Sequence, residues 1–106
     1  MRFSKEYDSA AKRWNVSLSG EVDAAYAEEM KRELLSMIEE KPADIMLDCA
    51  LLSYLDSSGL GVLIGTLKKA KEKGNKVVIK NLKPHIGRIF AITKLDTLFS
   101  IEVSKG

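Results

Sequence analysis

The opening part of the chain alternates between apolar and polar residues. Trp14, Val16 and Leu18 are apolar, whereas the residues between them are polar, which is the period-2 pattern of a half-buried strand. Phe3–Tyr7 has the composition of another short strand, and residues 8–11 between the two segments are typical of a turn. Together these segments predict an opening β-hairpin.

The pattern changes to a helical period after residue 23. From Ala24 to about Glu40, apolar residues recur every three or four positions and charged residues fill the opposite face, which predicts an amphipathic helix. Asp23 is a suitable N-cap because its short side-chain oxygen accepts a bond from the first turn, and Lys41-Pro42 ends the helix. The apolar positions of this helix are Ala27, Met30, Leu34, Met37 and Ile38.

The rest of the chain alternates short apolar runs with helical segments. A second amphipathic helix ends at Lys73-Gly74-Asn75, and Pro84 opens a shorter third helix. Because strands that alternate with helices favour a partly parallel sheet, we expect a single α/β domain with a mixed four- to five-stranded sheet and helices mainly on one face. The remaining expected strands are Ile45–Cys49, Val77–Ile79 and Leu98–Ile101.

Size and composition restrict the class of protein. A chain of 106 residues, 45% hydrophobic and 30% charged, is usual for one globular domain, and we expect residues 1–106 to form it. One cysteine, Cys49, and one histidine, His85, provide neither an internal disulfide nor a zinc-binding set. The sequence has no 18-residue apolar run and no signal-peptide core, so we expect a cytoplasmic protein without a membrane segment.

Charge is distributed unevenly along the chain. The formal net charge of +2 gives no support for direct nucleic-acid binding. Residues 1–56 carry 7 basic and 12 acidic side chains, whereas residues 57–106 carry 10 basic and 3 acidic ones. The simpler interpretation is a set of solvated faces, and the alternative is a surface that attracts an acidic partner. The absence of glutamine beside many Lys and Glu residues is typical of a thermophilic source.

The stretch Leu55–Gly61, Leu-Asp-Ser-Ser-Gly-Leu-Gly, lies between a buried strand and the second helix. Either Asp56 or Ser57 is suited to cap that helix. Capping does not account for three glycines in or near one helix, each of which costs about 0.8–1.0 kcal/mol relative to alanine in a helix interior. Close packing on the sheet or close approach by a partner's backbone is expected to offset this loss. The glycines are Gly59, Gly61 and Gly65.

Enzymatic motifs fit this stretch poorly. The chain has no P-loop sequence, and Gly59-Leu60-Gly61 begins a dinucleotide-binding pattern whose third glycine is replaced by Ile64. A nucleophile elbow needs a glycine two residues before the serine, which is absent here. His85 has no evident acidic partner for a catalytic triad. A catalytic role is therefore the weaker hypothesis.

Three aspartates near predicted element ends are candidates for a shared magnesium site. Asp23, Asp48 and Asp56 all carry the carboxylate oxygens that this ion prefers. Helix caps and strand ends explain the same residues more simply. We therefore expect no catalytic residue, no metal site and no cofactor.

The glycine-rich stretch resembles the signature of a known family. Asp56–Leu63, Asp-Ser-Ser-Gly-Leu-Gly-Val-Leu, is similar to the motif of the anti-sigma factor antagonists, the small bacterial STAS domains. Gly20–Asp23, Gly-Glu-Val-Asp, resembles the segment that precedes the first helix in that family. Lys73–Asn75, followed by a Val-rich strand, fits as well. The resemblance extends over nearly the whole chain.

The resemblance implies a protein that binds an anti-sigma factor and so releases a sigma factor. In the family, the first serine of the motif is phosphorylated by the anti-sigma factor, an ATP-dependent serine kinase, and a serine phosphatase is expected to act on the product. Carried over to this chain, the phosphoacceptor is Ser57. The residues expected at the partner-binding surface are Asp23, Asp56, Ser57, Ser58, Gly59 and Gly61.

A phosphate on Ser57 is also physically reasonable. It would lie at a helix N-terminus, which tolerates an anion, and would add about −1.5 to −2 charge beside Asp56. We expect this group to block a binding surface centred on Ser57 through bulk and like-charge repulsion. Two alternatives remain at this stage: a STAS component of a stress-signalling complex, and a small phosphate- or nucleotide-binding protein.

Overall fold

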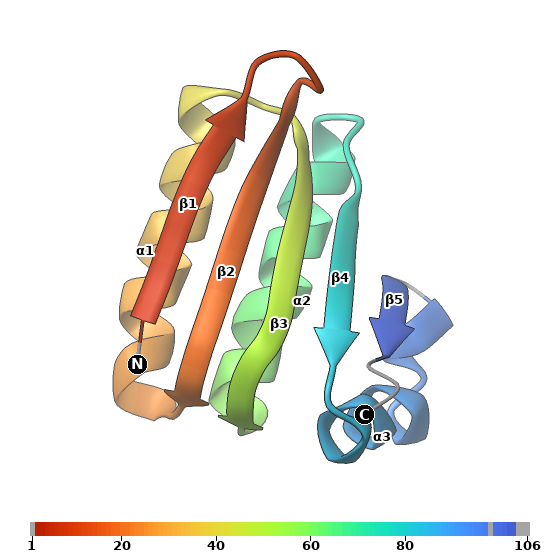
Figure 1. The fold of residues 1–106 in the computed structure, drawn as a ribbon. Coiled ribbons are helices and arrows are strands. Elements are labelled where there is room, and N and C mark those ends of the chain that lie inside the picture. Colours follow the sequence, from red (N-terminus) through yellow and green to blue (C-terminus); the bar gives the residue numbers. More distant parts are fainter. Residues whose placement is uncertain (1, 98, 104–106) are drawn as a thin grey trace.

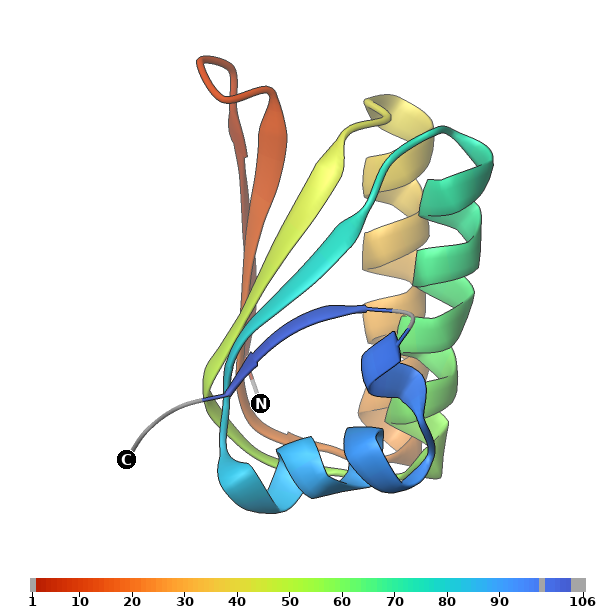
Figure 2. The ribbon, with the colours of Figure 1, turned by 90° about the vertical axis from the view of Figure 1, so that its right-hand side faces the viewer.

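The computed structural model describes residues 2–97 and 99–103. Five strands form one sheet in the order β1-β2-β3-β4-β5, and two long helices cover one of its faces (Figures 1 and 2). The α/β fold class predicted from the sequence is confirmed. The elements are β1 (Arg2–Asp8), β2 (Arg13–Val22), α1 (Ala24–Glu40), β3 (Asp44–Leu55), α2 (Ser57–Glu72), β4 (Val77–Leu82), α3 (Pro84–Ile92), a 3₁₀ turn (Leu95–Thr97) and β5 (Ser100–Val103).

The sheet is mixed, as expected. β1 and β2 form the antiparallel hairpin, and the pairs β2–β3, β3–β4 and β4–β5 are parallel. Because parallel strands end at the same edge of a sheet, the N-termini of α1 and α2 also lie side by side at that edge (Figure 1). The short helix α3 closes this end of the molecule (Figure 2).

The core lies between the sheet and the two long helices. Apolar residues of β2 and β3 alternate toward α1 and α2, and the five apolar positions predicted for the first helix are all buried. Trp14 is buried at one end of this core, where its Nε1 donates to the carbonyl of Lys41 at 2.9 Å. None of the helices in the described residues is long and apolar enough to span a membrane.

Three predicted strands have other bounds in the structure, and one of them, Val77–Ile79, simply continues to Leu82. β3 continues to Leu55 instead of ending at Cys49, because a register shift against β2 lets the strand continue where the apolar–polar alternation breaks. The last strand begins at Ser100 rather than at Leu98, because a 3₁₀ turn precedes it and the amide of Phe99 donates to Leu95. Leu98 itself lies outside the described residues.

Cys49 is on the buried face of β3, and burial is the main cause that raises the pKa of its thiol to about 12, with a smaller effect of Asp48. The folded state therefore holds the thiol proton more tightly than the unfolded state, whose pKa is about 8.5. We expect the stability that depends on the protonated Cys49 thiol to be fully present below pH 8.5. It is expected to be lost as the pH rises toward 12. Equilibrium unfolding between pH 8 and 11, compared with Cys49→Ala, measures the difference.

The same burial predicts that Cys49 has no role at a partner surface. Cys49→Ala and Cys49→Ser are expected to leave partner binding within a few-fold of the wild type, because no surface group changes. A large loss of binding in a variant that keeps its fold would show that the thiol itself is functional.

Candidate functional site

The two sequence segments of the predicted site lie next to each other in space. Val22 pairs with Leu55 in the register between β2 and β3, and the amide of Asp56 donates to the carbonyl of Val22 at 3.4 Å. Asp23 and Asp56 follow these paired residues directly. The Gly-Glu-Val-Asp and Asp-Ser-Ser-Gly segments therefore form one edge of the domain, at the carboxyl ends of β2 and β3 (Figure 1).

Two aspartates cap the two helices that begin at this edge. Oδ1 of Asp56 accepts the amide hydrogens of Ser58 and Gly59, at 2.9 and 3.2 Å. Oδ1 of Asp23 accepts the amide of Tyr26 at 3.0 Å. Of the two candidate caps for α2, Asp56 is the one in use, so Ser57 becomes the first residue of the helix and its side chain is exposed.

The three glycines of α2 have different surroundings. Gly59 is buried, and a Cβ atom there would lie 2.6 Å from Cδ1 of Leu55 and 2.7 Å from Cγ1 of Val22. A Cβ atom on Gly61 or Gly65 would meet no atom within 4 Å. Close packing on the sheet thus accounts for Gly59, whereas the other two positions are open to solvent.

The open glycines line a hollow along the outer surface where α1 and α2 meet. Its volume is about 460 Å³, and it begins at Ser58, beside the exposed Ser57. Glu28, Lys31 and Leu35 line the α1 side of the hollow. Of the predicted partner-binding residues, Asp23, Asp56, Ser57, Ser58 and Gly61 are at least partly accessible, and Gly59 lies beneath them.

The start of α1 carries an acidic hollow of about 380 Å³. Glu21, Asp23 and Glu29 supply its carboxylates, and Tyr26 contributes a ring. Partial burial, followed by the charges of Glu29 and Glu33, raises the pKa of Tyr26 above its ordinary value. A negative field therefore exists at this edge before any phosphate is added.

Two exposed apolar side chains in β3 were missed by the sequence analysis. Leu51 and Tyr54 are 67% and 48% exposed, and Tyr54 pairs in register with Glu21, two residues before Asp56. The break in apolar–polar alternation after Cys49 was the signal that could have indicated them. Where the alternation breaks, the strand register turns some apolar side chains outward, away from the core. Tyr54 therefore adds an exposed apolar side chain to the edge that holds Ser57.

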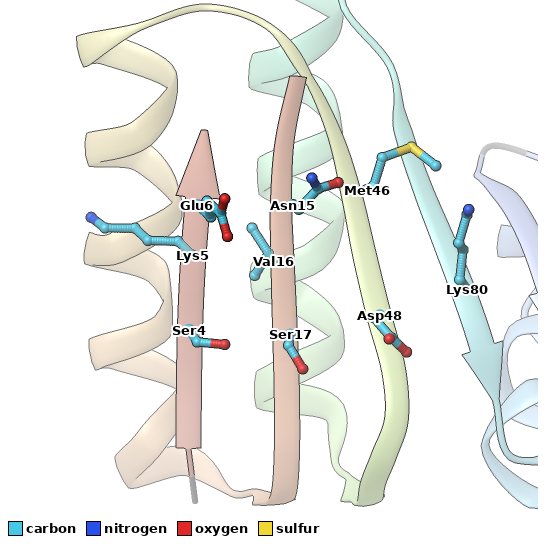
Figure 3. Close-up of a pocket in the computed structure, with 9 residues that line it drawn as sticks. All are labelled: Ser4, Lys5, Glu6, Asn15, Val16, Ser17, Met46, Asp48 and Lys80. Atoms are coloured by element: carbon cyan, nitrogen blue, oxygen red, sulfur yellow. The ribbon is translucent and has the colours of Figure 1, made fainter. Parts of the chain in front are cut away.

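The face of the sheet opposite the long helices is uncovered and polar. A hollow of about 410 Å³ on this face is lined by side chains from β1, β2, β3 and β4 (Figure 3). Ser17, Asp48 and Lys80 are among the polar groups that line it, which allows this face to contact water. Lys5 also lines the hollow, but its ammonium pairs with Glu33 of α1 at 3.0 Å.

The three aspartates considered for magnesium occupy separate structural positions. Asp23 and Asp56 are the helix caps, and Oδ1 of Asp48 accepts the amide of Ala50 and the side-chain amide of Asn81 at 3.0 and 3.2 Å. In the part of the chain that the structure describes, no three His, Cys, Asp or Glu side chains come together as a metal-binding group.

Comparison with known proteins relates most of this chain to one family. The family model for the Mlab, STAS domain matches residues 6–101. The anti-sigma-B factor antagonist of Bacillus subtilis is 37% identical over 86 residues, which cover 81% of this chain and 78% of that protein. The protein of the same name from Staphylococcus aureus is 32% identical over 101 residues, 95% of this chain and 94% of that protein.

Solved structures show the same fold at lower sequence identity. The anti-sigma factor antagonist SpoIIAA in its unphosphorylated form has a TM-score of 0.73 at 22% identity, over 86% of this chain and 83% of that one. The phosphorylated form of the Bacillus SpoIIAA has a TM-score of 0.75 at 20% identity, over 98% of this chain and 93% of that one.

Proposed function

We propose that this chain, which belongs to the STAS domain family, is an anti-sigma factor antagonist that binds its partner through the surface around Ser57 and loses that binding when Ser57 is phosphorylated. The observation that carries the proposal is the exposed Ser57 at the start of α2, beside the loop that holds Asp23. Relatives named as anti-sigma-B factor antagonists support the class of partner. Residues 1–106 act as one STAS domain in this proposal.

The binding surface consists of the accessible groups at the edge where α1 and α2 begin. Asp23 and Asp56 supply carboxylates, Ser57 and Ser58 supply hydroxyls, and Tyr54 adds an apolar side chain. Gly61 extends the surface into the hollow between the helices. Gly59 is buried beneath this surface, where an added Cβ atom would come too close to Val22 and Leu55.

The switch acts on the partner rather than on the fold. A phosphate on Ser57 faces the N-terminal end of α2, where the helix dipole favours an anion, so the domain itself is not expected to unfold. The same phosphate adds bulk and about −1.5 to −2 charge to a surface that already carries Asp23, Asp56 and Glu21. A partner surface that fits the hydroxyl form is therefore repelled by the phosphorylated form.

The partner in this proposal is a serine kinase that uses ATP and phosphorylates the antagonist that it binds. A serine phosphatase restores the hydroxyl form. The antagonist contributes no catalytic group, and it acts in the cytoplasm by binding alone. Calorimetric titration of the cognate anti-sigma factor with the unmodified and the phosphorylated chain tests the proposal, and equal affinity for the two forms would contradict it.

Ser57→Ala is expected to abolish phosphorylation and to keep partner binding within a few-fold, because the variant loses only one hydroxyl and Asp56 still caps α2. Ser58→Ala, which changes the neighbouring exposed hydroxyl, is the matched control and should still accept the phosphate. Phosphopeptide mapping by mass spectrometry distinguishes the two serines. Label on Ser58 of the wild type would reject the assignment of Ser57.

A further inference from the structure

β3 extends well beyond the part of it that pairs with β4. The parallel register between these strands covers only Ile45–Asp48 against Val77–Lys80, whereas β2 stays paired with β3 as far as Leu55. The edge of β3 that faces β4 therefore has no ladder partner after Asp48 in the described register. Figure 1 shows the two strands separating toward the edge that holds the candidate site.

The separation begins at a left-handed residue in β4. Asn81 has a φ of 61°, a conformation that asparagine tolerates better than most residues. Its side-chain amide donates to Oδ1 of Asp48 at 3.2 Å, and the same oxygen accepts the amide of Ala50 at 3.0 Å. Where the backbone ladder between β3 and β4 ends, the side chains of Asp48 and Asn81 therefore connect the two strands.

Lys83 and His85 contact backbone carbonyls in the part of β3 that has no β4 partner. The ammonium of Lys83 donates to the carbonyls of Ala50 and Leu52 at 3.0 and 3.2 Å, and Lys83 is only partly exposed. Nε2 of His85 lies 3.1 Å from the carbonyl of Ser53. Because a carbonyl oxygen only accepts, Nε2 carries the proton in this contact.

These bonds end four residues before the proposed phosphoacceptor. Three contacts with Lys83 and His85 satisfy the carbonyls of Ala50, Leu52 and Ser53. The strand then continues through Leu55 and the cap Asp56 into α2. A charged donor makes stronger bonds than a neutral one, so Lys83 is the main element of the bridge. The beginning of α3 is thereby fixed to the segment that presents Ser57.

We propose that Lys83, assisted by His85, is a positioning residue for the Ser57 segment. This inference rests on the proposed function, because it names a residue that acts on the same site from the start of α3. Lys83 touches neither the hydroxyl of Ser57 nor a reacting atom in the described contacts; it holds the backbone of β3 that leads to them. Without the Lys83 ammonium, the end of β3 would sample more orientations. The kinase would then find Ser57 less often in an orientation that allows phosphorylation.

The first test measures the segment without any partner. Lys83→Met keeps a long side chain but removes the donor, and Lys83 makes no side-chain cap to α3 that the change could disturb. Amide hydrogen exchange over residues 50–58 is expected to accelerate at least about tenfold, which corresponds to about 1.4 kcal/mol of local opening. Exchange in the buried turns of α1 should stay unchanged.

Two further variants complete this test. Lys80→Met is the matched control, because Lys80 lies nearby in β4 and its side chain makes no ion pair or hydrogen bond with another described residue. Lys83→Arg restores a charged donor and should return exchange over residues 50–58 to near the wild-type rate. Wild-type exchange in Lys83→Met, or equal acceleration in Lys80→Met, would overturn the proposal.

The second test uses the cognate kinase. Lys83→Met is expected to lower kcat/KM for phosphorylation of Ser57 about tenfold, and Lys83→Arg should recover it. If the kinase fails to phosphorylate even the wild type, the proposed function fails while the exchange result still decides the role of Lys83. Should Lys83→Met not fold, His85→Phe removes the contact with Ser53 alone, and unchanged exchange there would reject the bridge.

Discussion

Ser57→Asp is expected to lower the affinity for the anti-sigma factor by at least about tenfold while it leaves the stability of the domain nearly unchanged. A loss of about 1.4 kcal/mol at the interface already produces that change in affinity. A carboxylate at the first position of α2 gains about 0.3–1 kcal/mol from the helix N-terminus, so the fold has no reason to fail. A carboxylate carries less charge than a phosphate, so the variant is expected to act as a partial mimic.

The measurement pairs calorimetric binding with thermal unfolding. Ser36→Asp is the control, because Ser36 is also exposed but lies in α1 twelve residues after its start, roughly 18 Å along the helix axis. This control should keep wild-type affinity, which excludes a general effect of added charge. Unaltered affinity in Ser57→Asp would contradict an interface switch, and a collapse in Tm would show that the charge acts by disrupting the fold.

The sequence predicted those elements whose local patterns agree with their tertiary positions. α1 has the predicted bounds because its apolar spacing, the cap Asp23 and the stop at Pro42 indicate the same segment. Local signals also predicted the opening hairpin and the end of α2 at Gly74, which adopts a left-handed conformation with a φ of 77°. In each case no distant contact was needed to decide the element.

The unpredicted features depend on contacts between distant segments. The extension of β3 to Leu55 results from its pairing with β2, because Ala50 and Leu51 break the local pattern. The bridge from Lys83 to Ala50 joins residues 33 positions apart, and no local spacing indicates it. The late start of β5 follows from the 3₁₀ turn before it.

The sequence indicated most residues of the candidate site, but neither Tyr54 nor the spatial arrangement of the site. The motif indicated Ser57 and the nearby capping residues, whereas the register of Val22 with Leu55 places Asp23 beside them. The sequence left open which residue caps α2 and why α2 tolerates glycines. The structure assigns the cap to Asp56 and separates Gly59 from the open glycines.

Gly59→Ala and Gly61→Ala are expected to change stability in opposite directions, although the chemical change is the same. A Cβ on Gly59 would lie 2.7 Å from Cγ1 of Val22, a fully buried and stiff side chain, so its neighbours must shift. Overpacking costs about 1–3 kcal/mol and outweighs a helix gain of at most about 1 kcal/mol. A Cβ on Gly61 meets nothing within 4 Å, so only the helix gain remains.

Urea unfolding of the two variants measures this difference. The free energy of unfolding should fall by up to about 2 kcal/mol for Gly59→Ala and rise by up to about 1 kcal/mol for Gly61→Ala. A fall in both variants would contradict the open surroundings of Gly61. If a partner's backbone approaches the hollow at Gly61, the more stable variant should bind the anti-sigma factor more weakly, because the added methyl group occupies that space. Stability and binding would then change in opposite directions, which a defect in folding cannot produce.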